Sequence, residues 1–135
     1  MGNRAVIAFC ENEMPTTKKD NHVGMYLHWN GGRDSVEGFC EAARRLGYHG
    51  DRSYGIARFT QMVANWFGGH LNVGVETYDK LDTDNWDNGV YWIDKNFKIV
   101  GREFVRNPEQ KNYDLEEFVT DVLNKNKPTD ETGGS

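Results

Sequence analysis

The amino-acid sequence predicts an α+β fold, a mostly antiparallel sheet with an antiparallel helix pair inserted between its strands and a C-terminal helix. Three observations support this prediction. The chain has 135 residues, the length of one domain. Short β-rich segments lie on both sides of two neighbouring stretches with helical periodicity, so strands and helices occur in groups instead of alternating. A third amphipathic stretch follows the last predicted strand.

The first half of the chain is predicted to form two strands and then two helices. The strands cover residues 4–9 and 24–29 and enclose a polar loop. The first helix starts near Asp34, which lies three residues before Glu37 as in a capping box. Ser53 is the expected N-cap of the second helix. The short link between the two helices predicts that they run antiparallel.

The second half is predicted to form three strands and one helix, at residues 73–78, 90–93, 97–104 and 115–124. Residues 79–89 form an acidic loop between the first two of these strands. Asp114 is the expected cap of the helix. Residues 125–135 are expected to be a disordered tail. Residues 1–124 are therefore predicted to form a single domain.

Composition and charge argue against several classes of protein. The net charge is −5, whereas a protein that binds duplex nucleic acid needs a broad basic face. No apolar run approaches the roughly 20 residues of a membrane span, and two cysteines without a close pair do not predict a disulfide framework. We therefore expect a cytoplasmic protein without a membrane or duplex nucleic acid as partner. A hydrophobic share of 37% favours a thin core and self-association.

Residues 30–35, Asn-Gly-Gly-Arg-Asp-Ser, lie where a predicted strand passes into a helix. Free backbone N–H groups and the helix dipole favour an anion at such a position, and Arg33 adds a bidentate donor for phosphate. The spacing matches neither established phosphate-binding motif. Two glycines before a capped helix also serve simply to make the turn, so both interpretations remain open.

In the predicted strand 97–104 and just beyond it, strand alternation would place Arg102, Phe104 and Arg106 on one face. A cation, an aromatic ring and a second cation in a row would suit a diphosphate and an adjoining ring. The alternative is an exposed edge strand protected by charge.

The acidic loop superficially resembles a calcium loop, but Ile93 stands where the bidentate Glu belongs. Its Asn, Asp and Trp side chains could contact the hydroxyls and base edge of a nucleotide if a neighbouring arginine supplies the charge. Ordinary turn chemistry is the simpler explanation. The scattered histidines predict no zinc site, and no motif nominates a nucleophile with its base. We therefore predict no metal, no cofactor and no catalytic residue.

Three segments, residues 24–36, 54–58 and 84–90, resemble the bacteriophage Thoeris anti-defence proteins of the first type, and the resemblance covers residues 4 to about 120. It implies a non-catalytic sponge in the cytoplasm of the host bacterium. Such a protein sequesters cyclic ADP-ribose isomers, and members of the family can also bind cyclic trinucleotides of CBASS immunity. The resemblance further implies dimers that assemble into a hexamer. Residues 1–124 would then be one ligand-binding domain.

The resemblance implies seven ligand-binding residues: Tyr78, Asn88, Arg102, Arg106, Gly32, Arg33 and Arg58. Tyr78 corresponds to a base-stacking aromatic, where the family pattern has Phe, and Asn88 to a polar contact. Arg102 and Arg106 would hold the diphosphate of an ADP-ribose-type ligand at an interface between two protomers.

For the cyclic trinucleotide, the resemblance implies Gly32 and Arg33, on a threefold-related surface. Arg58 or Arg52 can share either role. Two other functions remain open from the residues alone. A phosphodiesterase-like, nucleotide-processing enzyme would hold a divalent metal with acidic-loop aspartates, Asp82, Asp84 or Asp87. A host-protein interaction module would use its acidic surface, and the glycine loop would be only a turn.

Overall fold

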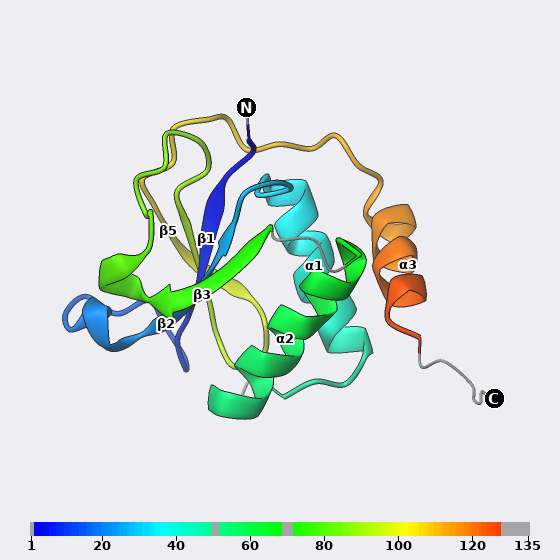
Figure 1. Ribbon diagram of the computed structural model, residues 1–135, viewed down its shortest axis with the longest axis horizontal. Helices are drawn as coiled ribbons and strands as arrows, with labels where there is room; N and C mark the ends of the chain where they lie inside the picture. Colours follow the sequence, from blue (N-terminus) through cyan, green and yellow to red (C-terminus); the bar gives the residue numbers. More distant parts are fainter. Residues whose placement is uncertain (1, 50–51, 69–71, 128–135) are drawn as a thin grey trace.

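A five-stranded sheet forms the centre of the molecule in the computed structural model, which describes residues 2–49, 52–68 and 72–127 (Figure 1). The strands are β1 (Ala5–Phe9), β2 (Val23–Leu27), β3 (Val73–Thr77), β4 (Val90–Ile93) and β5 (Ile99–Glu103). Their order is β3-β2-β1-β4-β5. All neighbouring pairs are antiparallel except β1 and β4, which are parallel. The predicted α+β class with a mostly antiparallel sheet is confirmed.

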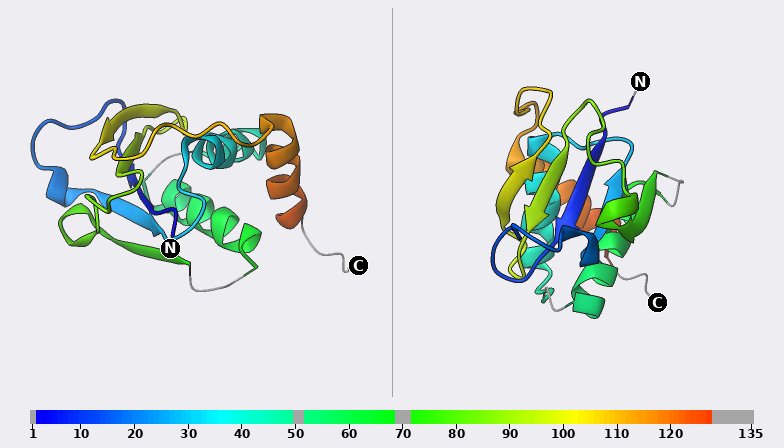
Figure 2. Two further views of the ribbon diagram at one scale, coloured as in Figure 1. Left: turned by 90° about the horizontal axis from the view of Figure 1, so that it is seen from above. Right: turned by 90° about the vertical axis from the view of Figure 1, so that its left-hand side faces the viewer.

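The α-helices are α1 (Arg33–Arg45), α2 (Arg52–Trp66) and α3 (Leu115–Lys125). They gather on one face of the sheet (Figure 2), where α1 descends and α2 rises at a wide angle to it in Figure 1. The C-terminal helix α3 packs mainly against α1 and less against α2. Two short 3₁₀ helices, η1 (Lys19–Asn21) and η2 (Tyr78–Lys80), lie in the loops.

The central strands of the sheet are buried on both faces. On the helix-covered face, strand residues such as Ile7 and Tyr91 pack against Phe39 and Phe59 of the helices. On the opposite face, Val6, Ala8, Val90 and Trp92 form a smaller cluster under loop residues that include Met14, Tyr78 and Leu81. We call this the loop-covered face. Burial on both faces explains why β1 and β4 are apolar at nearly every position.

The start of α1 differs from the predicted capping box. Gly32 is the N-cap and makes no side-chain cap, while Asp34 lies inside the first turn. Glu37 does not reach back to the helix start but pairs with Arg33 at 2.8 Å. The predicted N-cap of α2 was also wrong, because Ser53 lies within the helix.

The last strand is shorter than predicted and ends at Glu103. Phe104 has a φ of 54°, and the chain then turns so that the N–H of Arg106 donates to the carbonyl of Asp87 at 3.0 Å. The predicted row of Arg102, Phe104 and Arg106 on one strand face is therefore wrong. The physical reason is that the left-handed Phe104 ends the strand alternation, and the N–H groups of Arg106 and Asn107 then bond to the Asp87 carbonyl of the acidic loop.

The C-terminal helix agrees with prediction at its start, where the Asp114 carboxylate accepts the N–H of Glu117 at 3.0 Å. It continues one residue further than predicted, and the Asn126 side chain then donates to the carbonyl oxygens of Met62 and Val122. Residues 128–135 of the predicted tail lie outside the described residues. Within the described ranges, no helix is long and apolar enough to span a membrane.

Candidate functional site

A segment after β5 crosses the N-terminal end of α1 on its way to α3 (Figure 1). We call residues 104–114 the strap. The strap carbonyl of Gln110 accepts the N–H of Asp34 at 3.1 Å, and the Asp34 carboxylate accepts the N–H groups of Ser35 and of Asn112 in the strap. The N–H groups of Asp34 and Ser35, which could have held an anion, are therefore already bonded within the chain.

Arg33 and Arg102 meet at one carboxylate of the strap. Nη1 of Arg33 lies 2.9 Å from Oε2 of Glu109, and Nη1 of Arg102 donates to the same oxygen. Burial would raise the pKa of Glu109, but hydrogen bonds from Arg102 and Arg33 outweigh it and hold this pKa below its usual range. The structure thus brings together two arginines to which the family resemblance gives different ligands.

Arg102 is fixed from several sides. Its Nε donates to the Val90 carbonyl at 3.0 Å and its Nη2 to the Asn88 carbonyl at 2.5 Å. The guanidinium carbon lies 3.6 Å from the centre of the Tyr91 ring, a cation–π contact. The Tyr91 hydroxyl in turn donates to the Gly31 carbonyl at 2.7 Å. Strand β4 therefore links Arg102 to the glycine loop.

The two glycines of this loop are required for close packing. A Cβ on Gly31 would lie 2.6 Å from the Cβ of Ala5 in β1, and a Cβ on Gly32 would lie 2.3 Å from the side chain of Gln110. The loop is therefore pressed between the sheet and the strap. Gly32 contributes space at the site, and Arg33 contributes the charged group.

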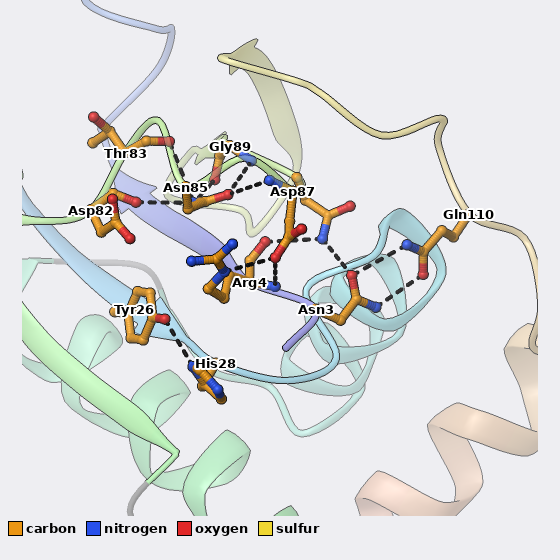
Figure 3. Close-up of polar contacts among 11 residues, drawn as sticks. Asn3, Arg4, Tyr26, His28, Asp82, Thr83, Asn85, Asp87, Gly89 and Gln110 are labelled. Atoms are coloured by element: carbon orange, nitrogen blue, oxygen red, sulfur yellow. Dashed lines mark hydrogen bonds and ion pairs between the residues drawn. The ribbon is translucent and has the colours of Figure 1, made fainter. Parts of the chain in front are cut away.

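Asn88 connects the acidic loop to the strap through a chain of amides, of which Figure 3 shows the Asn3–Gln110 pair. Its Nδ2 donates to Oδ1 of Asn3 at 2.6 Å and to the Arg4 carbonyl at 2.9 Å, while Asn3 and Gln110 exchange two hydrogen bonds. Asn88 is only 1% exposed. Its Oδ1 has no donor within the described part of the chain, which is unusual for a buried amide oxygen.

The acidic loop is held in one shape by Asn85. The Asn85 amide donates to three carbonyls of the loop and accepts the N–H groups of Asp87 and Gly89 (Figure 3). Asp87 also pairs with Arg4 at 2.8 Å. These contacts fix both ends of the loop without using its outward-facing side chains.

Trp86 lies at the tip of the acidic loop. The family resemblance does not include it among the ligand-binding residues. Trp86 is 70% exposed and has a φ of 65°, an uncommon conformation for a bulky residue. The guanidinium carbon of Arg106 lies 5.0 Å from the centre of its ring. Arg106 also forms a two-bond pair with the Asp84 carboxylate, at 2.9 and 2.6 Å. Arg106 is thus the neighbouring arginine expected for this loop.

Tyr78 lies away from the arginines, on the loop-covered face. Its ring stacks on Trp92 at 5.2 Å and its hydroxyl donates to Glu103 at 2.6 Å. Burial, reinforced by Glu103, raises the pKa of Tyr78. Arg102 is paired in register with Tyr91, whose ring packs on the helix-covered face, so Tyr78 and Arg102 lie on opposite faces of one sheet.

Arg58 is also remote from the other predicted residues. It lies on the exposed side of α2, over the Tyr54 ring at 5.3 Å. The seven predicted residues therefore divide by place. Four belong to the strap region, namely Gly32, Arg33, Asn88 and Arg102, whereas Arg106, Tyr78 and Arg58 each occupy a different setting.

Two surface hollows adjoin Arg33. The larger has a volume of about 550 Å³ and is lined by residues of the α1 start and the strap, including Arg33, Glu109, Lys111 and Tyr113. The other, of about 380 Å³, lies between α1 and β5. A third hollow of about 600 Å³, at the end of β1, is lined among the described residues by three acidic residues and by no arginine or lysine, so it suits an anion poorly.

Two of the three aspartates that could hold a metal in the acidic loop are paired with arginines. Asp84 pairs with Arg106 and Asp87 with Arg4, and the described residues contain no group of three His, Cys, Asp or Glu side chains placed to hold a metal. Both cysteines are free thiols. Burial raises the pKa of Cys10 to about 11 and that of Cys40 to about 12, so neither is a thiolate at neutral pH.

No protein-family model matches this chain, and searches of curated proteins and of solved structures return no significant match.

Proposed function

We propose that this protein is a phage anti-defence sponge, which binds and sequesters cyclic ADP-ribose-type signals of Thoeris immunity without cleaving them, and that cyclic trinucleotides of CBASS immunity are a second ligand class. The observation that carries this proposal is the meeting of Arg33 and Arg102 at one carboxylate beside a hollow of about 550 Å³. Ligand pockets commonly have volumes of roughly 300–1,000 Å³, and paired arginines are the usual partners of phosphate oxygens.

The loop tip offers a second contact surface for a nucleotide. The Trp86 ring is largely open to solvent, and base–aromatic stacking contributes roughly 1–3 kcal/mol per base. Arg106 lies beside the ring, and its guanidinium can exchange the ion pair with the exposed Asp84 for one with a phosphate group. Trp86 and Arg106 together would then supply a ring contact and a charge contact.

The side chains at both surfaces favour binding over chemistry. They are arginines, amides and aromatic rings, and a guanidinium stays protonated at any physiological pH and cannot act as a general base. A sponge needs an affinity of roughly 10 kcal/mol to hold a signal at tens of nanomolar concentration. Several charge-assisted hydrogen bonds of about 1.5–3 kcal/mol each, with stacking, can supply it.

The separation of Tyr78 from Arg102 supports an assembly of several chains. Within one chain these residues lie on opposite faces of the sheet, so one ligand could contact both only if Tyr78 comes from a neighbouring protomer. Light scattering should therefore give the mass of a dimer or of a hexamer, both with and without ligand. A monomer under both conditions would contradict this part of the proposal.

The deciding experiment identifies the bound compound. The protein is loaded with a cyclic ADP-ribose isomer, washed, denatured, and the released compound is analysed by mass spectrometry. We expect the intact cyclic compound. Release of a linear product would instead indicate the nucleotide-processing enzyme, and loss of turnover with a chelator would show that this enzyme depends on a metal. Failure to bind any cyclic nucleotide by calorimetry would favour the host-protein interaction module.

A further inference from the structure

The carboxylate of Glu109 lies where a phosphate group could bind. Its Oε2 accepts hydrogen bonds from Nη1 of Arg33, at 2.9 Å, and from Nη1 of Arg102. Carboxylate and phosphate oxygens are bound by guanidinium groups in the same way. Because both nitrogens reach the same oxygen atom, they are close enough together for one phosphate group to contact both.

We propose that Arg33 and Arg102 form one anion-binding site, that Glu109 fills it in the free protein, and that a phosphate group of the ligand displaces the Glu109 carboxylate. The identification of that ligand as a nucleotide rests on the proposed function. The anion-binding site and its occupation by Glu109 do not depend on the proposed function.

The two arginines are held more firmly than the carboxylate. Arg102 is bonded to two carbonyl groups of β4 and the acidic loop and stacks on Tyr91, while Nε of Arg33 is held by Glu37 at 2.8 Å. Glu109 belongs to the irregular strap, and its side chain is 36% exposed. It can therefore turn into solvent while both guanidinium groups remain in place.

The space beside the site fits a nucleotide. Arg33 and Glu109 both line the hollow of about 550 Å³, so a displaced Glu109 side chain would leave Arg33 facing this volume and would release Nη1 of Arg102 from the same oxygen. Lys111 adds a positive charge to the wall, and Tyr113, which is 50% exposed, adds an aromatic ring. The two other carboxylates of the wall are already bonded, Asp34 to the strap and Glu37 to Arg33. The phosphate position and a surface for a ring thus occur together.

The ion pairs of Glu109 with Arg33 and Arg102 are weak enough for a phosphate group to replace them. Ion pairs between partly exposed side chains contribute little, because water and salt screen them and two long side chains must be ordered. A phosphate group carries at least as much charge as the carboxylate and brings further contacts from the rest of the ligand. Removing the Glu109 charge should therefore strengthen binding of an anion, opposite to the effect expected if Glu109 helped to hold the ligand.

The test uses inorganic pyrophosphate as the probe and isothermal calorimetry at low salt. Wild type is compared with Glu109→Gln, with Glu109→Ala, and with Glu116→Gln as the control. Glu116 makes an arginine ion pair of its own, with Arg45, at a position on α3, so the control removes the same charge elsewhere. We expect pyrophosphate to bind both Glu109 variants roughly three- to tenfold more tightly than wild type, with the control unchanged.

Adding Arg102→Ala to Glu109→Gln should abolish the gain, because the site then lacks one arginine. Unfolding in urea shows whether each variant is folded, and Glu109→Ala supplies an independent measurement if the first variant is not. Equal or weaker pyrophosphate binding by the folded Glu109 variants, or no binding by any protein, would overturn the inference. A clear gain for pyrophosphate without binding of any cyclic nucleotide would refute the proposed function and leave this site in place.

Discussion

Glu103 and Trp86 have opposite environments, the first largely buried and the second exposed. The Glu103 carboxylate accepts hydrogen bonds from Lys19, Tyr78 and Trp92 on the loop-covered face, and its side chain is 15% exposed. Trp86 is instead exposed and held at a positive φ. Strained residues persist where the surrounding structure fixes them, and they concentrate at functional sites. The first residue therefore serves stability, and the second is the better candidate for binding.

Replacing Glu103 by Gln should lower the free energy of unfolding by about 1.5–3 kcal/mol. The change removes the negative charge that Lys19, Tyr78 and Trp92 all contact. Part of the lost stability arises because these donors are left with a weaker acceptor. Urea unfolding at pH 7 measures the difference. Glu116→Gln is the control, because its ion pair is more exposed, and a loss of the same size there would contradict the explanation.

Replacing Trp86 by Gly should stabilise the fold by about 1 kcal/mol and weaken nucleotide binding. Glycine adopts the positive φ of 65° without strain, while the stacking surface is lost. Trp86→Ala is the matched control, since it removes the ring but keeps a Cβ. Thermal unfolding and calorimetry on both variants separate the effects. Unchanged ligand affinity in both would remove Trp86 from the site.

At the scale of elements, two irregular segments hold the candidate site, and both are fixed by specific polar bonds. The acidic loop closes around the amide of Asn85, which is 1% exposed. The strap is attached to the start of α1 by Gln110 and Asp34. Loops commonly carry binding residues when a rigid scaffold positions them. Here β4 and β5 provide that scaffold, because Arg102 extends from β5 across to the carbonyls of Val90 and Asn88.

Replacing Asn85 by Ala should lower the free energy of unfolding by about 2–3 kcal/mol, because buried carbonyl and N–H groups would lose their partner. It should also weaken ligand binding, since Trp86 and Asn88 would no longer be held in place. Urea unfolding and calorimetry test the two effects. Asn96→Ala, in the exposed turn between β4 and β5, is the control and should change neither quantity.

Across the whole molecule, carboxylates hold loops against the sheet. Glu103 and Glu109 do so by pairing with cationic or hydrogen-bonding partners. Burial would raise the pKa of Glu103, but hydrogen bonds from Lys19, Tyr78 and Trp92 hold it below its usual range. Glu109 is shifted in the same direction by Arg102 and Arg33. In the unfolded chain both groups return to an ordinary pKa of about 4.3.

Acid should therefore destabilise this protein. A folded-state pKa that is lowered contributes stability above the unfolded pKa, and this contribution is lost as the pH falls from near 4.3 through the lower folded value. The midpoint of thermal unfolding, measured from pH 7 to pH 3, should drop in that range. The double variant Glu103→Gln, Glu109→Gln should show a smaller drop over the same range. An equally steep drop in the double variant would assign the acid sensitivity to other groups.

Local sequence patterns identify most of the strands and helices, because a buried face leaves a periodic pattern in each segment. The central strands β1 and β4 and the apolar stripe of α1 were predicted on that basis, and the cap at Asp114 from its residue type. The composition suggested a thin core, whereas the central strands are buried on both faces of the sheet. Loop residues cover much of the loop-covered face, and loops carry no periodic pattern from which this burial could be predicted.

How these segments meet depends on contacts between residues far apart in the sequence. The parallel pairing of β1 with β4 joins residues far apart in sequence, and no local pattern encodes it. The start of α1 is set by the strap, which bonds to Asp34 from the other end of the chain. The same strap places Glu109 between Arg33 and Arg102, so two motifs with separate sequence interpretations form one charged cluster. Contacts of this kind depend on chain packing, which brings residues together without any spacing in the sequence.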